Sequence, residues 1–145
     1  MWQIRRARGK DHEAVAKLWD SAGLGRTEEE EWQAITESST TSLLVAEAEG
    51  EIVGTIVAAF DGWRAYIYHV AVAPALRGQG LAKALIAEAE QYLHQHGAKR
   101  IYALINGDNT AGLALCASMG YEPEGDIAFV KTTFIKSRRA WKVAN

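Results

Sequence analysis

One stretch in the middle of the chain, residues 66–82, constrains the fold more than any other part of the sequence. It reads YIYHVAVAPALRGQGLA, an apolar β-rich run followed by a proline, a glycine-rich turn and the start of a helical pattern. Gly78 and Gly80 lack side chains, so the backbone can turn sharply there and bring its N–H groups close to a ligand. The first N–H groups of the following helix have no intrahelical acceptor and lie at the positive end of the helix dipole. The segment therefore predicts a strand, a tight turn and a helix whose N-terminus attracts phosphate.

Formal charge around this turn is one-sided. Between Asp61 and Glu88 the sequence has no carboxylate, whereas Arg64, Arg77 and Lys83 all lie inside that window. The whole chain, in contrast, has a formal net charge of −2, which argues against a broadly basic surface for nucleic acid. We therefore expect an anion site at the turn and no nucleic-acid partner.

The flanking sequence supplies the other elements of a single domain over residues 1–145, because no repeat, low-complexity tract or linker divides the chain. Alternating apolar residues predict strands over residues 2–8, 42–47, 52–60, 65–72, 100–105 and 129–135. Helical spacing predicts helices over residues 11–22, 78–96 and 109–119, and a capping box of Thr27 and Glu30 starts a further helix that turns Trp32 and Ile35 inward. This order predicts an α+β fold with a mixed, largely antiparallel sheet of about 6–7 strands and about 4 helices.

Cysteine content and hydropathy limit which metal sites, disulfides and cellular locations are expected. Cys116 is the only cysteine, so neither an intrachain disulfide nor a cysteine-based zinc site can form. His94 and His96 are two residues apart and do not share a helical face, so they do not suggest a metal site either. No run of 18 apolar residues and no signal-peptide pattern occurs. We expect a cytoplasmic protein with no metal and no membrane association.

Two known phosphate-binding motifs fit the glycine-rich turn poorly. The dinucleotide-binding fingerprint requires a spaced third glycine that Gly78-Gln79-Gly80-Leu81-Ala82 lacks, and it opens a β-α-β unit rather than following a β meander. The Walker loop requires Gly-Lys-Ser/Thr, which is missing here. A nucleotide-phosphate binder of another kind stays open, and ATP or NAD would stabilise such a protein.

Two motifs in this chain form a pair, one at the glycine-rich turn and one nearer the C-terminus. Arg77-Gly78-Gln79-Gly80-Leu81-Ala82, with Val70-Ala71-Val72-Ala73-Pro74 before it in the expected place, resembles the Arg/Gln-x-x-Gly-x-Gly/Ala signature of the GNAT superfamily of N-acetyltransferases. Asn109-Thr110-Ala111, then Leu115, then Gly120-Tyr121 resembles its second motif. The two motifs occur in the order and at the separation usual in that superfamily. The chain therefore resembles its small bacterial single-domain acetyltransferases.

The resemblance implies how acetyl-CoA binds. The fourth and fifth strands of such a sheet splay apart, so that pantetheine pairs with the fourth strand and the pyrophosphate rests on the glycine-rich turn. A backbone N–H of the same strand would polarise the thioester carbonyl. The residues implied for acetyl-CoA are Val70, Ala71, Val72, Arg77, Gly78, Gln79, Gly80, Leu81, Ala82, Lys83 and Asn109.

The resemblance also implies direct attack by an amine on the thioester within a ternary complex. Many relatives place a glutamate base where this chain has Tyr68, so Tyr68 or His69 is the candidate to accept the proton. Adjacent strand residues face opposite ways, so we expect only one of the two to line the site. Where the family commonly has a tyrosine acid, this chain has Cys116, whose shorter side chain leaves that role open.

The sequence leaves the acceptor and the catalytic status open. The acceptor expected from the resemblance is an amine-bearing small molecule or peptide, and edge strands leave a homodimer possible. Because Tyr68 and Cys116 depart from the usual base and acid, the alternative is a catalytically weak acyl-CoA-binding or regulatory module. That module would bind the cofactor without turning over any amine.

Overall fold

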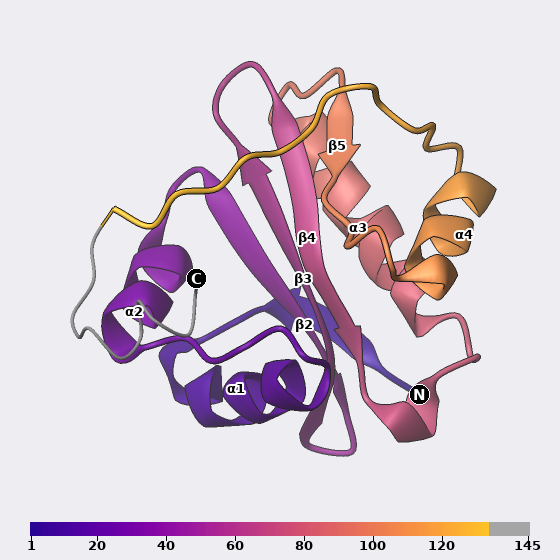
Figure 1. The fold of residues 1–145 in the computed structure, drawn as a ribbon. Helices are drawn as coiled ribbons and strands as arrows, with labels where there is room; N and C mark the ends of the chain where they lie inside the picture. The colour runs from indigo at the N-terminus through magenta and orange to yellow at the C-terminus, as the bar shows by residue number, and fades with distance from the viewer. Residues whose placement is uncertain (134–145) are drawn as a thin grey trace.

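A computed structural model describes residues 1–133, and these residues form a five-stranded sheet with helices on both faces (Figure 1). The strands lie in the order β1 (Gln3–Arg6), β2 (Thr41–Ala48), β3 (Glu51–Phe60), β4 (Ala65–Val72) and β5 (Ile101–Ala103). The first four pair antiparallel, and β5 runs parallel to β4. The helices are α1 (His12–Ser21), α2 (Glu29–Glu37), α3 (Leu81–Gln95) and α4 (Thr110–Ser118).

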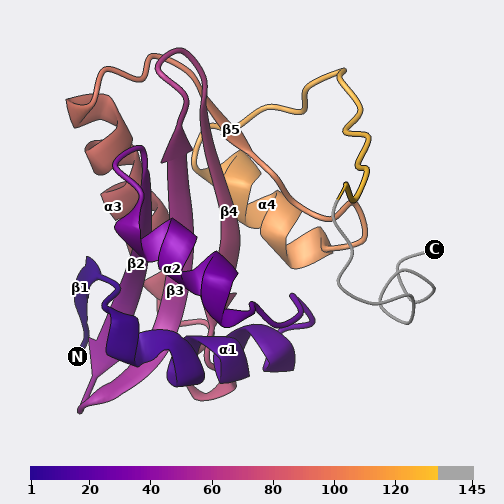
Figure 2. The same ribbon diagram turned by 90° about the vertical axis from the view of Figure 1, so that its left-hand side faces the viewer.

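Two hydrophobic clusters, one on each face, hold the helices to the sheet. Successive residues of a strand point to opposite faces of the sheet. Leu44 and Ile56 therefore join one cluster, while the residues that follow them, Val45 and Val57, join the other. The first cluster contains the buried stripe of α3 and reaches α4. The second contains Val15, Leu18 and Trp19 of α1 and Trp32 of α2, the two helices that Figure 2 shows on the other face of the sheet. The α+β class and the four helices predicted from the sequence are thereby confirmed.

Helix α3 lies close to the sheet because β3 carries a glycine beneath it. A Cβ at Gly54 would come within 3.0 Å of Leu85 Cδ1 and 3.1 Å of Leu81 Cδ2. Leu81 and Leu85 belong to the stripe that the sequence predicted, and both are buried. This close packing fixes the start of α3 beside the end of β4, where the glycine-rich turn joins them.

The predicted strand count is too high, because the described residues contain five strands rather than six or seven. Of the strand predicted over residues 129–135, residues 129–133 are not in a strand, and Phe134 and Ile135 lie outside the described residues. Phe129 and Val130 are 94% and 96% exposed. Their alternating pattern favours a strand, but a strand also needs a neighbour to pair with.

The predicted capping box of α2 is displaced by one residue. Glu28, not Thr27, is the N-cap, and its backbone N–H donates to Glu31 Oε1 at 3.1 Å. The carbonyl of Glu28 accepts the helical bond from the Trp32 N–H at 2.9 Å. The carbonyl of Thr27 instead lies 3.1 Å from His12 Nε2, so contact with α1 sets where α2 begins.

A partly buried ion cluster ties β1 to β2 and to the turn before α1. Arg5 binds both carboxylate oxygens of Asp11, at 2.8 and 3.1 Å, and also reaches Glu47 Oε1 at 2.7 Å. The N–H of Arg8 donates to Asp11 as well, at 2.7 Å. Asp11 is only 6% exposed, and the hydrogen bonds from Arg5 hold its pKa below the ordinary value although burial opposes them. The carboxylate is therefore a structural anchor.

We expect Asp11→Ala to lower the free energy of unfolding at pH 7 by about 2 kcal/mol, since hydrogen bonds to a buried charge are lost. Because the folded pKa of Asp11 lies below its unfolded value of about 3.9, this stabilisation is complete above that value. It is lost as the pH falls through the folded pKa. Urea unfolding at pH 7 and pH 3 measures both, and the difference between the variant and the native chain should shrink at pH 3.

Candidate functional site

The candidate site begins where β5 leaves β4. Backbone pairing joins Ala65–Ile67 of β4 to Ile101–Ala103 of β5, and a last bond runs from the Leu104 N–H to the Ile67 carbonyl at 3.0 Å. Strand β4 continues to Val72 with β3 as its partner. Among residues 1–133, no strand pairs with the other edge of β4 after Ile67, and Figure 2 shows the chain turning away there. The predicted splay is confirmed, and it leaves a backbone edge open to a ligand with amide groups.

Next to this edge lies the start of α3, where two glycines adopt left-handed backbone conformations. Gly78 has φ 77° and Gly80 has φ 86°, a region that costs other residues free energy. A Cβ at either position would meet no atom within 4 Å, so the surface above the turn is open. The first helical bond runs from the Ala84 N–H to the Gly80 carbonyl at 3.0 Å, which leaves the N–H groups of residues 81–83 without intrahelical acceptors. We call residues 78–83 the amide cradle.

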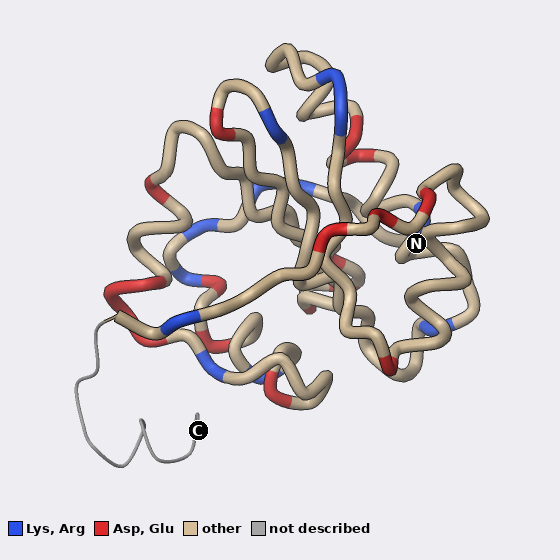
Figure 3. Tube along the Cα trace, turned by 45° about the horizontal axis from the view of Figure 1, so that its top comes forward, with Lys and Arg blue, Asp and Glu red and all other residues tan. Residues whose placement is uncertain are grey.

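Two cationic side chains accompany the amide cradle. Arg77 and Lys83 are both exposed, and Arg77 Nε donates to the Val72 carbonyl at 3.3 Å, which links the turn to the end of β4. Figure 3 shows the Lys and Arg residues of the described part of the chain in short segments dispersed among acidic ones. Positive charge at the cradle is therefore local, which suits a small anionic group such as a diphosphate.

Asn109, predicted to contact acetyl-CoA, has a structural function in the described fold. It is the N-cap of α4, and its Oδ1 accepts from the Gly112 N–H at 2.9 Å. The side chain lies flat over Gly112, where a Cβ would come within 2.6 Å of Asn109 Nδ2. This cap fixes the start of α4. A contact between Asn109 and acetyl-CoA stays a prediction.

Strand β4 carries a bulge at His69 that the sequence did not reveal. Tyr68 pairs with Val57 of β3 and Ala71 pairs with Thr55, so two residues of β4 lie opposite one of β3. His69 is the extra residue, with φ 51°. A bulge of the G1 type is signalled in the sequence by a glycine at the left-handed position, and His69 offers no such signal.

The bulge overturns the expectation that the side chains of Tyr68 and His69 face opposite ways. Tyr68 packs against the cluster on the α1–α2 face, and the ring of His69 meets Trp19 of α1 edge-on at 4.8 Å. The two rings themselves meet edge-on at 5.5 Å. Side-chain alternation fails here because the extra residue interrupts it, so both side chains lie together on one face of β4.

Partial burial sets the protonation of these two side chains. Burial lowers the pKa of His69 below its ordinary value and raises the pKa of Tyr68. Near neutral pH the imidazole is therefore uncharged and the phenol keeps its proton. A neutral imidazole can accept a proton from an attacking group, and a phenol can donate a hydrogen bond.

Cys116 lies on the opposite face of the sheet from His69 and Tyr68. It is 8% exposed and belongs to the cluster beneath α3. Burial, and then the charge of Glu90, raise the pKa of its thiol, while Glu90 itself accepts a hydrogen bond from the Tyr121 hydroxyl at 2.7 Å. The structure thus brings Tyr68 and His69 together but not Cys116, whose thiol keeps its proton on the other face of the sheet.

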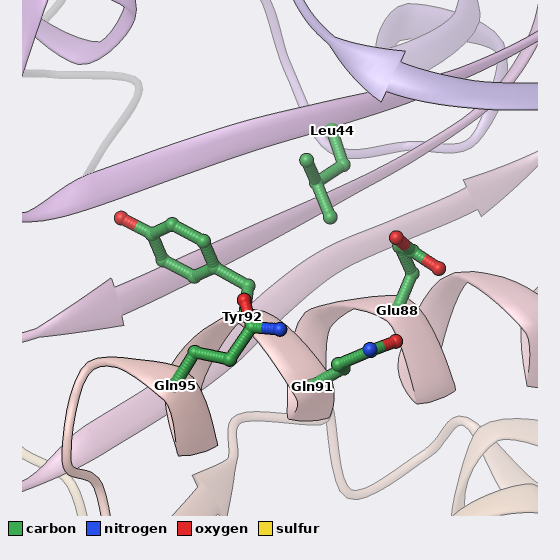
Figure 4. Close-up of a pocket in the computed structure, with 5 residues that line it drawn as sticks. All are labelled: Leu44, Glu88, Gln91, Tyr92 and Gln95. Atoms are coloured by element: carbon green, nitrogen blue, oxygen red, sulfur yellow. The ribbon is translucent and has the colours of Figure 1, made fainter.

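Two hollows on the described surface lie away from the amide cradle, and the first is lined by His94, Gly97, Ala98 and Lys99. A hollow of about 180 Å³ between β2 and α3 is lined by Leu44, Glu88, Gln91, Tyr92 and Gln95, none of them a predicted site residue (Figure 4). In the part of the chain that the structure describes, no three His, Cys, Asp or Glu side chains gather in a group that could hold a metal ion. Across residues 1–133, every helix falls short of the length and apolar character that a bilayer crossing requires.

Known proteins resemble this chain over most of its length. The sequence pattern of the acetyltransferase (GNAT) family matches residues 5–121. An acetyltransferase of Photorhabdus laumondii is 37% identical over 123 residues, which are 83% of this chain and 86% of the relative. An acetyltransferase of Sodalis glossinidius is 32% identical over 139 residues, covering 94% and 98% of the two chains.

A solved structure with the same fold contains a coenzyme A derivative. The aminoglycoside N-acetyltransferase AAC(6')-Iy, in complex with the bisubstrate analog CoA-S-monomethyl-acetylneamine, superposes with a TM-score of 0.77. The match covers 92% of this chain and 99% of that one at 18% sequence identity. At this identity the likeness concerns the fold alone.

Proposed function

This chain belongs to the acetyltransferase (GNAT) family, and from that premise we propose that it transfers an acetyl group from acetyl-CoA to an amine by direct attack within a ternary complex. The observation that carries the proposal is the open edge of β4 ending beside the amide cradle. A strand edge offers N–H and C=O groups to the two amides of pantetheine, and the cradle offers N–H groups to the pyrophosphate.

The residues of the cradle and of β4 fit acetyl-CoA, which supplies an activated thioester. The amides of residues 78–83 would hold the pyrophosphate, with Arg77 and Lys83 adding charge. The backbone of Val70, Ala71 and Val72 would pair with the pantetheine arm. The open space above Gly78 and Gly80 supports this assignment, because an approaching phosphate needs the room that a Cβ at either position would fill.

We assign the proton transfers to residues on both sides of β4. A neutral amine attacks the thioester carbon, and its surplus proton passes to the uncharged imidazole of His69, which Tyr68 adjoins. A backbone N–H of residues 70–72 donates to the thioester oxygen as negative charge develops there. The C–S bond then breaks, and the thiol of Cys116 is the proposed proton donor to the departing sulfur.

We expect Cys116→Ala to lower kcat about 10-fold, less than the usual 100-fold of a general acid, because a thiolate leaves readily. Cys116→Val removes the same proton but fills the space of the thiol, so it separates chemistry from packing. Equal losses of kcat in both variants, measured with saturating acetyl-CoA, are the expected result. Wild-type rates in Cys116→Val would instead identify Cys116 as a packing residue of the α3 cluster.

Turnover of acetyl-CoA with a panel of amines tests the proposed function. The panel includes aminoglycosides, polyamines, amino acids and peptides. Aminoglycosides are included because a solved structure of the same fold is an aminoglycoside acetyltransferase, and the other amines are included because that likeness concerns the fold alone. Release of free thiol that requires both acetyl-CoA and one acceptor is the expected result. Binding of CoA without turnover of any amine would favour the acyl-CoA-binding module, and stabilisation by ATP or NAD but not CoA would reject both.

A further inference from the structure

The bulge in β4 needs something to hold it, because His69 has φ 51°, a backbone conformation that is uncommon for a residue other than glycine. Glu49 shares this conformation in the turn between β2 and β3, but His69 lies inside a strand, where such a conformation persists only when surrounding contacts determine it. Most of the carbonyls of β4 that face β3 are fixed by the regular ladder. At the bulge that ladder is interrupted, so the carbonyl of His69 requires another donor.

A buried relay of hydrogen bonds supplies that donor. Trp19 Nε1 donates to Thr55 Oγ1 at 2.8 Å, and Thr55 Oγ1 donates to the carbonyl oxygen of His69 at 3.0 Å. An indole N–H can only donate and a carbonyl can only accept, so the direction of the hydroxyl proton between them is fixed. Thr55 is 0% exposed and Trp19 is 3% exposed, which shields both bonds from competing water.

The relay also determines where the next N–H group points. Every peptide bond in the described residues is trans, so the carbonyl of His69 and the N–H of Val70 belong to one plane and point in opposite directions. Thr55 holds the carbonyl toward β3. The N–H of Val70 is thereby turned away from β3, toward the side of β4 that β5 has left.

Trp19 holds the His69 side chain as well as its carbonyl. Its ring meets the imidazole edge-on at 4.8 Å with an interplanar angle of 85°. One residue of α1 thus acts on the main chain of the bulge through Thr55 and on the ring of His69 directly. Packing of α1 against β3 and β4 fixes the position of this tryptophan.

We propose that Trp19 and Thr55 are positioning residues for acetyl transfer: the relay holds the β4 bulge so that the Val70 N–H and the His69 imidazole are preorganised at the open strand edge. The inference rests on the proposed function. Neither residue touches the reacting atoms, so both act through the backbone and the ring of His69. A displacement of a catalytic group by about 1 Å lowers the rate of the chemical step more than it lowers the affinity for the substrate.

The decisive variant is Thr55→Val, which keeps the shape of threonine and removes the hydroxyl. We expect kcat to fall about 10- to 100-fold, and the KM for acetyl-CoA and the Kd for CoA to change less than kcat, because the amide cradle is untouched. Thr55→Ser keeps the relay and should return kcat to within about threefold of wild type. Trp19→Phe removes only the indole N–H and should give an intermediate loss.

A second readout needs no substrate. In the free protein, deuterium exchange of the amides of residues 68–72 should rise at least about 10-fold in Thr55→Val and stay near wild type in Thr55→Ser, with α3 unchanged. Ser42→Ala removes another buried residue's hydroxyl from the same sheet, at a position paired with Ala58, and is the matched control for loss of a buried polar group. It should leave both exchange at the bulge and kcat at wild-type values.

The two readouts separate failure of the relay from failure of the proposed function. The positioning role is wrong if Thr55→Val leaves both kcat and the amide exchange of residues 68–72 unchanged. It is also wrong if kcat falls as far in Thr55→Ser as in Thr55→Val. If the wild-type protein turns over no amine but Thr55→Val still loosens the bulge selectively, the relay stands as a structural clamp and the transfer role is rejected. Uniform loosening of the whole sheet would also overturn the proposal.

Discussion

Gly80→Val is expected to raise the Kd for CoA about 100-fold, a loss of roughly 2.7 kcal/mol in binding free energy. Gly80 is the N-cap of α3 and has φ 86°, which a β-branched residue adopts only with strain. The new side chain would also occupy the open space above the amide cradle. Both effects move the N–H groups of residues 81–83 away from the pyrophosphate. The affinity for CoA should therefore fall more than the free energy of unfolding.

Gly97→Val is the matched control for this change. Gly97 follows the other end of α3, has φ 98° and likewise has no atom within 4 Å of an added Cβ. The strain is therefore comparable, but the residue lies a helix length away from the cradle. Calorimetric titration with CoA should show wild-type affinity for Gly97→Val at a temperature where both variants remain folded. A similar loss in both variants would mean that Gly80 serves stability rather than binding.

The features that the sequence predicted are those that depend on residue type alone. Gly78 and Gly80 mark a turn because only glycine adopts φ near 80° at little cost. The stripe of α3 follows from helical spacing, and Leu81 and Leu85 are buried as that spacing predicts. Such local rules were sufficient to place the turn, the helix and the strand before it, which together form the cradle and the open edge.

The features that the sequence missed depend on contacts between distant segments. The bulge at His69 exists because Thr55 of β3 and Trp19 of α1 bind its carbonyl and its ring, and these residues are 14 and 50 positions away along the chain. In the sequence Trp19 is only one member of an apolar helix stripe. The displaced start of α2 has the same origin, because its first residues are set by contact with His12. Periodicity cannot report such contacts.

His69→Asn is expected to lower kcat/KM about 100-fold at neutral pH, the usual contribution of a general base. Asparagine tolerates a positive φ well, so the bulge should persist. The relay should persist too, because Thr55 binds the main-chain oxygen of residue 69 and not its ring. The variant therefore removes the proton acceptor while leaving the backbone geometry of β4 in place.

The pH profile identifies the role of His69 more sharply than the rate at one pH. A base must be uncharged, and burial lowers the pKa of His69, so kcat/KM of the wild type should stay level at neutral pH and fall only as the pH drops through a value below about 6.5. An acceptor whose amine is neutral throughout this range keeps its own titration out of the profile. The acidic fall should vanish in His69→Asn and persist in His94→Asn, which changes an exposed histidine on α3. If His69→Asn keeps the acidic fall, another group accepts the proton and Tyr68, its neighbour in the bulge, becomes the candidate to replace next.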